Sequence, residues 1–103
     1  MKEITANELK KLQDNGEKVL VQYTASWCGP CRSLSPKLEL ISNTYSDVKF
    51  SKIDVDNLEN QDLIINLGIM SVPTVIIYNG HKVVDRSKGL HPDNYYKDVL
   101  NNL

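Results

Sequence analysis

The stretch ASWCGPC, residues 25–31, contains both cysteines of the chain and separates two segments of different pattern. Before it, Lys18 to Thr24 centres on Val-Leu-Val, a short apolar run typical of a strand that is covered on both faces. After it, apolar residues recur at steps of four, three and four, the stripe of an amphipathic helix: Leu34, Leu38, Ile41 and Tyr45. The cysteines are therefore expected where a buried strand leads into a helix, which Pro36 should kink.

The spacing of Cys28 and Cys31 favours reversible thiol chemistry over structural crosslinking. Cys28 falls at the start of the helix, where unpaired backbone N–H groups and the positive end of the helix dipole stabilise a thiolate. A cysteine in such a place has a lowered pKa and acts as the attacking group. Cys31 lies one turn further on, close enough to bond with Cys28, and we expect it to be the deeper of the two. A bridge that closes so small a loop constrains the unfolded chain little, so no structural purpose is expected.

The other segments follow one another without a linker or an internal repeat. A capping box at Thr5 and Glu8 predicts a helix that ends at Gly16. The dipeptide Asn79-Gly80 predicts a tight hairpin between two strands. The remaining pattern predicts a strand over 48–55, a helix over 58–67, and strands over 73–78 and 82–86. It also predicts a helix from Pro92, with Tyr95, Val99 and Leu103 on one face, flanked by Tyr96 and Leu100.

This order of elements indicates the α/β class. The early crossover connections predict parallel strands, and the hairpin adds an antiparallel edge. With a short first strand at residues 2–4, we expect a central mixed sheet of four to five strands flanked by four helices. The 103 residues, of which 41% are apolar and 24% charged, suit a single domain over residues 1–103 with its own hydrophobic core.

Composition and charge argue against several classes of protein. Twelve basic residues face thirteen acidic ones and no basic stripe is present, so nucleic-acid binding is not expected. No apolar run approaches the ~20 residues needed to span a bilayer, so no membrane partner is expected. The first residues have no apolar stretch of the signal-peptide type, which predicts a cytoplasmic protein. A secreted domain built on disulfides would carry more cysteines at wider spacing.

The motif WCGPC at residues 27–31 resembles the active-site signature of the thioredoxin family, and the similarity runs over essentially the whole chain. Pro36 resembles the proline that kinks the family's active-site helix. The run Val-Pro-Thr at residues 72–74 resembles the family loop whose proline is cis and faces the cysteines. Lys52 resembles the lysine under the active site, and Gly89 the glycine that borders the substrate groove. The resemblance implies the thioredoxin fold.

This resemblance implies a protein-disulfide reductase and electron carrier that needs no cofactor and no metal. The thiolate of Cys28 would attack a disulfide in a target protein, and Cys31 would then resolve the mixed disulfide. The Cys28–Cys31 disulfide must afterwards be reduced, and nothing in the chain resembles a nucleotide-binding loop. The expected partners are therefore disulfide-containing target proteins and an upstream thioredoxin reductase, and the chain is expected to be a monomer.

The resemblance also implies a groove for the target beside the cysteines. Trp27 offers a flat apolar area next to the thiol, and Gly29 leaves space for the incoming chain. A cis bond before Pro73 would expose the backbone of Val72 for pairing with an extended substrate segment. The expected groove residues are Trp27, Gly29, Pro30, Val72, Pro73 and Gly89.

One position departs from the family pattern. Thioredoxins usually have a buried aspartate six residues before the first cysteine, where this chain has Gln22. That aspartate is thought to accept the proton of the second cysteine and to interact with the lysine, here Lys52. Gln22 can form hydrogen bonds, but it cannot accept this proton at neutral pH. The departure puts the usual proton route in doubt and leaves the fold unaffected.

Other interpretations of single residues stay open at this stage. The cysteines could be half of a zinc site, although only His81 and His91 could complete it and their spacing does not suit a zinc finger. Trp27 could be a core residue, Lys52 a solvated strand residue and Pro73 an ordinary proline at the start of a strand.

Two other functions also stay open. An oxidase or isomerase is the alternative within redox chemistry, although relatives with those roles usually carry a histidine between the cysteines, where this chain has Gly29 and Pro30. The third function is a non-redox scaffold, which two intact cysteines argue against as the sole role. Catalysis of insulin reduction separates a reductase from a pure scaffold.

Overall fold

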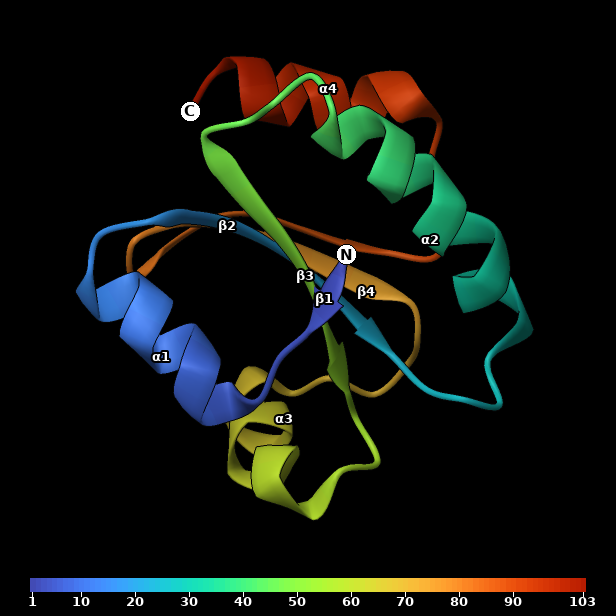
Figure 1. Cartoon of the computed structure of the whole chain (residues 1–103). Helices are drawn as coiled ribbons and strands as arrows, with labels where there is room; N and C mark the ends of the chain where they lie inside the picture. The colour runs from blue at the N-terminus through green and yellow to red at the C-terminus, as the bar shows by residue number, and fades with distance from the viewer.

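The computed structural model describes residues 1–103 as a mixed sheet with helices on both faces (Figure 1). The elements follow the predicted order, with a short 3₁₀ turn at Leu58–Asn60 ahead of the third helix. Their bounds are β1 Lys2–Glu3, α1 Ala6–Asp14, β2 Lys18–Thr24, α2 Gly29–Ser42, β3 Val48–Asp54, α3 Gln61–Leu67, β4 Thr74–Asn79, β5 Lys82–Lys88 and α4 Asp93–Asn101. The predicted four to five strands and four helices are confirmed.

The strands lie in the order β1-β3-β2-β4-β5. β1, β3 and β2 are parallel to one another, as the crossover connections predicted. β4 is antiparallel to β2, and β5 is antiparallel to β4. The antiparallel part of the sheet therefore begins at β4, one strand before the hairpin edge that the sequence predicted. The connection through α3 returns the chain to the far side of β2 in the reverse direction.

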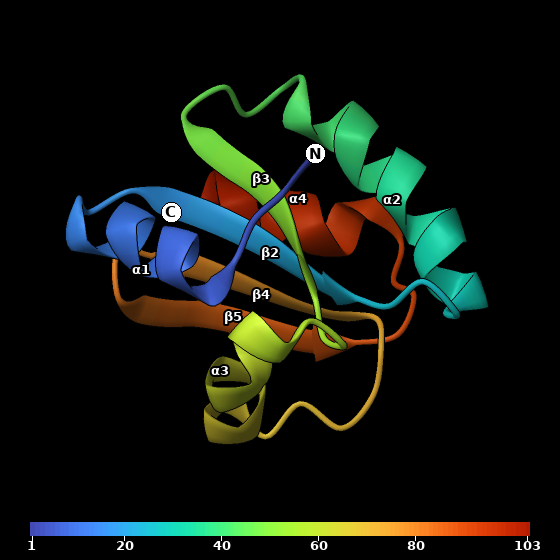
Figure 2. The ribbon, with the colours of Figure 1, turned by 60° about the horizontal axis from the view of Figure 1, so that its bottom comes forward.

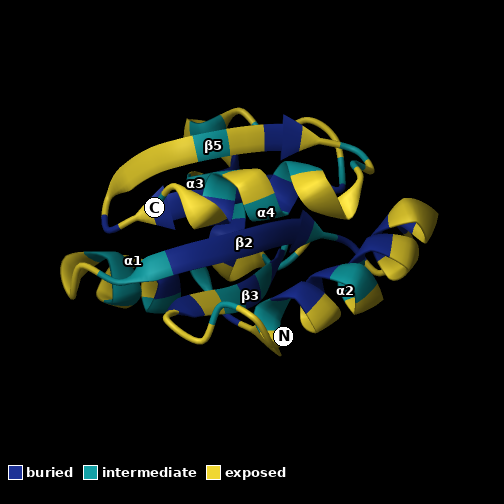
Figure 3. Cartoon of the chain, turned by 90° about the horizontal axis from the view of Figure 1, so that it is seen from above, coloured by how far each residue is buried: buried dark blue, intermediate teal, exposed yellow.

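Each face of the sheet has its own hydrophobic core. α1 and α3 cover one face, while α2 and α4 cover the other (Figure 2). β2 lies in the middle, and its residues Val19, Leu20 and Val21 are completely buried (Figure 3). This burial confirms the strand predicted from the apolar run. The loop that follows β2, and with it the cysteine motif, is thereby carried on the best-packed strand of the molecule.

The helix ends follow local signals in the sequence. The capping box of α1 is confirmed, because the Glu8 N–H donates to the Thr5 hydroxyl at 3.3 Å and the Thr5 N–H donates to the Glu8 carboxylate at 3.1 Å. Gly68 ends α3 in the left-handed conformation that favours glycine, with φ of 63°. None of the helices is long and apolar enough to cross a membrane.

The apolar stripe predicted for α2 includes one residue that lies outside the helix. α2 ends at Ser42, so Tyr45 lies beyond the helix. Tyr45 still packs against the same core, and its hydroxyl donates to Asn101 Oδ1 of α4 at 2.7 Å. Pro36 lies inside α2, which continues on both sides of it.

The last helix packs on the core through the predicted face and its flanking residues. Pro92 immediately precedes α4, and the fully packed positions are Tyr96 and Leu100. Tyr95 flanks them, because its hydroxyl reaches across to donate to Asp85 Oδ2 at 2.8 Å. Tyr95, Val99 and Leu103 pack against the same core as partly buried residues, so the predicted face is confirmed, but its most buried positions are the flanking residues Tyr96 and Leu100.

The hairpin closes one residue later than predicted. Asn79 pairs with Lys82, so the loop consists of Gly80 and His81, and Gly80 has a φ of 59°. Within β5, Val84 has no partner on β4 and forms a bulge. β5 is the outer strand on this side of the sheet.

Candidate active site

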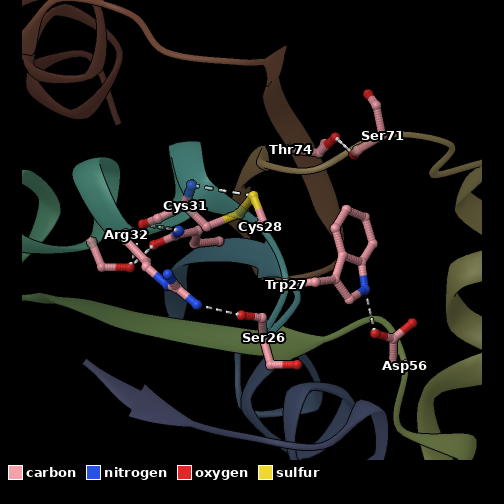
Figure 4. The surroundings of a disulfide bond; sticks show 10 residues. Ser26, Trp27, Cys28, Cys31, Arg32, Asp56, Ser71 and Thr74 are labelled. Atoms are coloured by element: carbon pink, nitrogen blue, oxygen red, sulfur yellow. Dashed lines mark hydrogen bonds between the residues drawn. A yellow bond between two sulfur atoms is a disulfide. The ribbon is translucent and has the colours of Figure 1, made fainter.

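The two cysteines sit where the buried strand β2 leads into α2. Cys28 is the N-cap of the helix, and its Sγ accepts a hydrogen bond from the Cys31 N–H at 3.2 Å (Figure 4). Pro30 occupies the first turn, where a missing N–H costs no helical hydrogen bond. The sulfurs are joined as a disulfide, with the two Cα atoms 5.4 Å apart. The predicted position of Cys28 at a helix N-terminus is thus confirmed.

Cys28 and Cys31 are buried to the same extent. Each residue exposes 3% of its surface, so the expectation that Cys31 lies deeper is wrong for the disulfide form. The bond draws both sulfurs into one small apolar cluster with Ala25, against which Val72 packs. A thiolate at Cys28 would be stabilised by the hydrogen bond from the Cys31 N–H and by the positive end of the α2 dipole.

Trp27 stands on the surface beside the disulfide. It exposes 68% of its surface, which rules out the interpretation as a core residue. Its Nε1–H donates to Asp56 Oδ2 at 2.8 Å, which holds the indole ring in place (Figure 4). Sequence reasoning missed Asp56, although it follows β3, whose carboxyl end meets that of the parallel strand β2 at one edge of the sheet. Gly29 and Pro30 are also exposed, on the first turn of α2.

A second loop approaches the cysteines from the other side. The peptide bond between Val72 and Pro73 is cis, and Val72 contacts the cysteine cluster. The Gly89 N–H donates to the Pro73 carbonyl at 2.9 Å, with Gly89 in the left-handed region at φ 77°. These contacts place Gly89 beside the loop that contains Pro73, on one side of the disulfide.

A small apolar pocket lies between Trp27 and Val72. Its volume is about 130 Å³, and its lining includes Ile64, Ile69 and Met70. Met70 exposes 96% of its surface, the largest fraction among the exposed large apolar residues of the chain. Met70 was not predicted from the sequence, because an isolated methionine in a loop carries no periodic signal.

Gln22 lies directly beneath the first turn of α2. It is completely buried, and its Nε2–H donates to the Cys31 carbonyl at 3.3 Å. The Ser35 hydroxyl lies 3.0 Å from Gln22 Oε1 and 2.9 Å from the same Cys31 carbonyl. Gln22 therefore ties β2 to the turn that carries Cys31. Ser35 was also missed, although it lies four residues after Cys31 and so on the same face of α2.

Lys52 lies opposite Gln22 in the parallel pairing of β2 and β3. It lines a cleft of about 230 Å³ that also reaches Cys31. The structure thus brings Lys52 under the active site, while its influence on the cysteines stays a prediction.

The histidines have partners other than the cysteines. His81 Nε2 lies 2.7 Å from Asp14 Oδ1, and His91 stacks on Tyr95 with ring centroids 4.5 Å apart. No group of three or more His, Cys, Asp or Glu side chains is placed to hold a metal ion. The arrangement supports a dithiol–disulfide centre and gives no support to a zinc site.

Comparisons with known proteins agree with this geometry. The Thioredoxin family model matches residues 2–102. The thioredoxin of Mycoplasmoides gallisepticum is 38% identical over 101 residues, which cover 97% of this chain and 99% of that protein. Thioredoxin-1 of Schizosaccharomyces pombe is 33% identical over 98 residues, which cover 95% and 93% of the two chains. The solved structure of Fasciola hepatica thioredoxin is 30% identical and covers 99% of this chain and 98% of its own, with a TM-score of 0.85. The chain therefore belongs to the thioredoxin family and is a thiol–disulfide oxidoreductase, with protein-disulfide reductase activity carried by Cys28 and Cys31.

Proposed function

We propose that the chain is a general reductant of protein disulfides, in which Cys28 attacks, Cys31 resolves and a separate reductase restores the dithiol. The observation that carries this assignment is the position of Cys28 as the N-cap of α2, where the helix stabilises a thiolate. The test is catalysis of insulin reduction by dithiothreitol. Turnover is expected, and a chain that gives none would overturn the proposal.

The exchange proceeds in two steps. The Cys28 thiolate bonds to one sulfur of the target disulfide, whose S–S bond breaks, and the other target sulfur leaves as a thiolate and takes up a proton. The Cys31 thiol then loses its proton and attacks Cys28 Sγ, which releases the second target sulfur. Two electrons pass from the cysteine pair to the target, and the product is the disulfide seen in the structure.

We infer that the target binds across the exposed rim of the disulfide. Trp27 and Val72 flank the cysteines, and the apolar pocket between them suits a side chain of the target. Gly29 and Pro30 leave the approach to Cys28 open, and Pro73 and Gly89 border it on the far side. An extended target segment would pair with the Val72 backbone.

The Trp27→Ala variant should lose target affinity without losing thiol chemistry. We expect kcat/KM for insulin to fall about tenfold, equivalent to ~1.4 kcal/mol, because the indole supplies apolar contact area. The rate with a small disulfide should stay within about twofold of the native rate. Leu40→Ala, which removes a similarly exposed apolar side chain from α2, away from the cysteines, is the matched control. Equal losses with both disulfides would show that Trp27 acts on the cysteines and does not bind the target.

The Pro30→His variant should be more oxidising than the native chain. An imidazole between the cysteines stabilises the thiolate of the reduced form, and a more stable reduced form has a higher potential. We expect a rise of at least ~30 mV, equivalent to ~1.4 kcal/mol for this two-electron couple. A redox titration against glutathione measures it, and Pro30→Ala separates the loss of proline from the gain of imidazole. An unchanged potential in Pro30→His would argue against a direct role for residue 30.

The cytoplasmic location, the monomeric state and the role as an electron carrier for a particular reductase stay predictions. Family membership supports disulfide-containing targets and a reductase partner in general terms. Pull-down with the Cys31→Ser variant, which retains bound targets, would identify the proteins concerned.

A further inference from the structure

Resolution requires a group that takes the proton of Cys31, and residue 22 cannot supply one. Gln22 is completely buried, with its amide engaged by Ser35 and by the Cys31 carbonyl. A carboxamide neither gains nor loses a proton near neutral pH. The proton of Cys31 therefore leaves by another route.

The cleft of about 230 Å³ beside Cys31 offers such a route. Its charged side chains come from three elements: Glu3 of β1, Arg32 of α2, and Lys52 and Asp54 of β3. A water molecule occupies ~30 Å³ of liquid, so the cleft has room for several waters with polar partners on every side. Protons can pass along such a chain from Cys31 to a carboxylate.

Asp54 is the better placed of the two carboxylates. It pairs with Thr24, the last residue of β2 before the cysteine loop, and neighbouring strands lie about 4.8 Å apart. Thr24 and Asp54 both line the cleft, together with Cys31 and Ser35 of α2. Asp54 Oδ1 accepts the Asp56 N–H at 2.9 Å, which fixes the carboxylate and leaves Oδ2 to accept from water.

Glu3 lies further from the cysteines. It pairs with Lys52, which in turn pairs with Gln22, so Glu3 is two strands away from β2. Lys52 also lines the cleft and brings a positive charge to it. Arg32 is held at the mouth, where its Nη2–H donates to the Ser26 carbonyl at 3.1 Å.

We propose that Asp54 accepts the proton of Cys31 through water in this cleft, while the Lys52 ammonium stabilises the thiolate that forms. The proposal rests on the proposed function, because it concerns the resolution step of that exchange. The Cys31 S–H bond breaks and its proton passes to the carboxylate. The thiolate then bonds to Cys28 Sγ, the bond from Cys28 to the target breaks, and the released target thiolate takes up a proton.

The test is a single-turnover reaction of the reduced chain with an aromatic disulfide that releases one coloured thiolate per cysteine consumed. The first phase reports attack by Cys28 and the second reports resolution by Cys31. For Asp54→Asn, which keeps an oxygen to accept the Asp56 N–H, we expect the second phase to slow about tenfold near pH ~7. The deficit should disappear towards pH ~9, where solvent deprotonates the thiol. The first phase should stay within about twofold of native.

Control variants separate this role from others. Asp47→Asn removes an exposed carboxylate outside the cleft and should change neither phase. A deficit in Asp54→Asn that is equal at all pH values would mean a structural role, and an unchanged second phase would overturn the proposal. A pH-dependent deficit in Glu3→Gln alone would move the assignment to Glu3 and equally overturn it. Failure of the proposed function would differ, because the first phase would then be absent in the native chain.

Discussion

The Cys28→Ser variant loses protein-disulfide reduction, whereas Cys31→Ser still attacks its target and then holds it as a mixed disulfide. We expect kcat for insulin to fall at least about a thousandfold in both variants, because a serine hydroxyl is ionised to a negligible extent at neutral pH. The variants nevertheless differ in what accumulates. In the proposed exchange, the Cys28 sulfur at the N-cap bonds to the target, and Cys31 is needed only for release.

Mass spectrometry after a single exposure to target distinguishes the two variants. Cys31→Ser should gain the mass of one target chain, which dithiothreitol removes, and Cys28→Ser should gain none. The reduced native chain, which should release the target, is the control, and circular dichroism shows whether each variant is folded. Turnover of a protein substrate by Cys31→Ser would mean that the roles of the two cysteines are assigned wrongly.

The Gln22→Asp variant should be less stable than the native chain at high pH. Residue 22 is completely buried, so desolvation would raise the folded pKa of the introduced carboxyl above its unfolded value of ~3.9. Below the unfolded value both states are protonated and the carboxyl adds no penalty. As the pH rises from there to the folded value, the unfolded state loses its proton first and stability falls. A rise of ~3 units in the pKa would cost about 4 kcal/mol at pH ~8.

Gln22→Asn is the matched control, because it has the shape of the aspartate without its charge. Denaturant melts of both variants at pH ~4 and pH ~8 give the difference in unfolding free energy, which should be small at the lower pH. An equal difference at both pH values would show that the site admits water. The same carboxyl should quicken resolution near neutral pH, since a base would then stand under the first turn of α2.

Local patterns predicted most of this fold because each signal was contained in a few adjacent residues. The capping box at Thr5, the apolar run of β2 and the cysteine spacing all needed only their neighbours. The errors arose where a contact distant in sequence decided the outcome. Tyr45, for example, reaches Asn101 from beyond the end of α2.

The residues of the candidate site also fall into two groups, those predicted from the local sequence and those that only the strand pairing brings close. The motif and the family pattern identified Cys28, Cys31 and Gln22, which the structure brings together. Asp56 and Asp54 were not identified, because their proximity to Trp27 and Cys31 follows from the pairing of β2 with β3. No single segment contains that information, since neighbouring parallel strands are separated by a helix.

The two outer strands of the sheet bear on how the protein behaves at high concentration. An exposed strand edge invites pairing with another chain, and proteins discourage this with short strands, charges and bulges. β1 has only the two charged residues Lys2 and Glu3, and β5 carries the Val84 bulge among the charged residues Lys82, Asp85, Arg86 and Lys88. Growth of the sheet by pairing with another chain is therefore disfavoured at both edges, and this protection does not require the apolar pocket between Trp27 and Val72 to be covered.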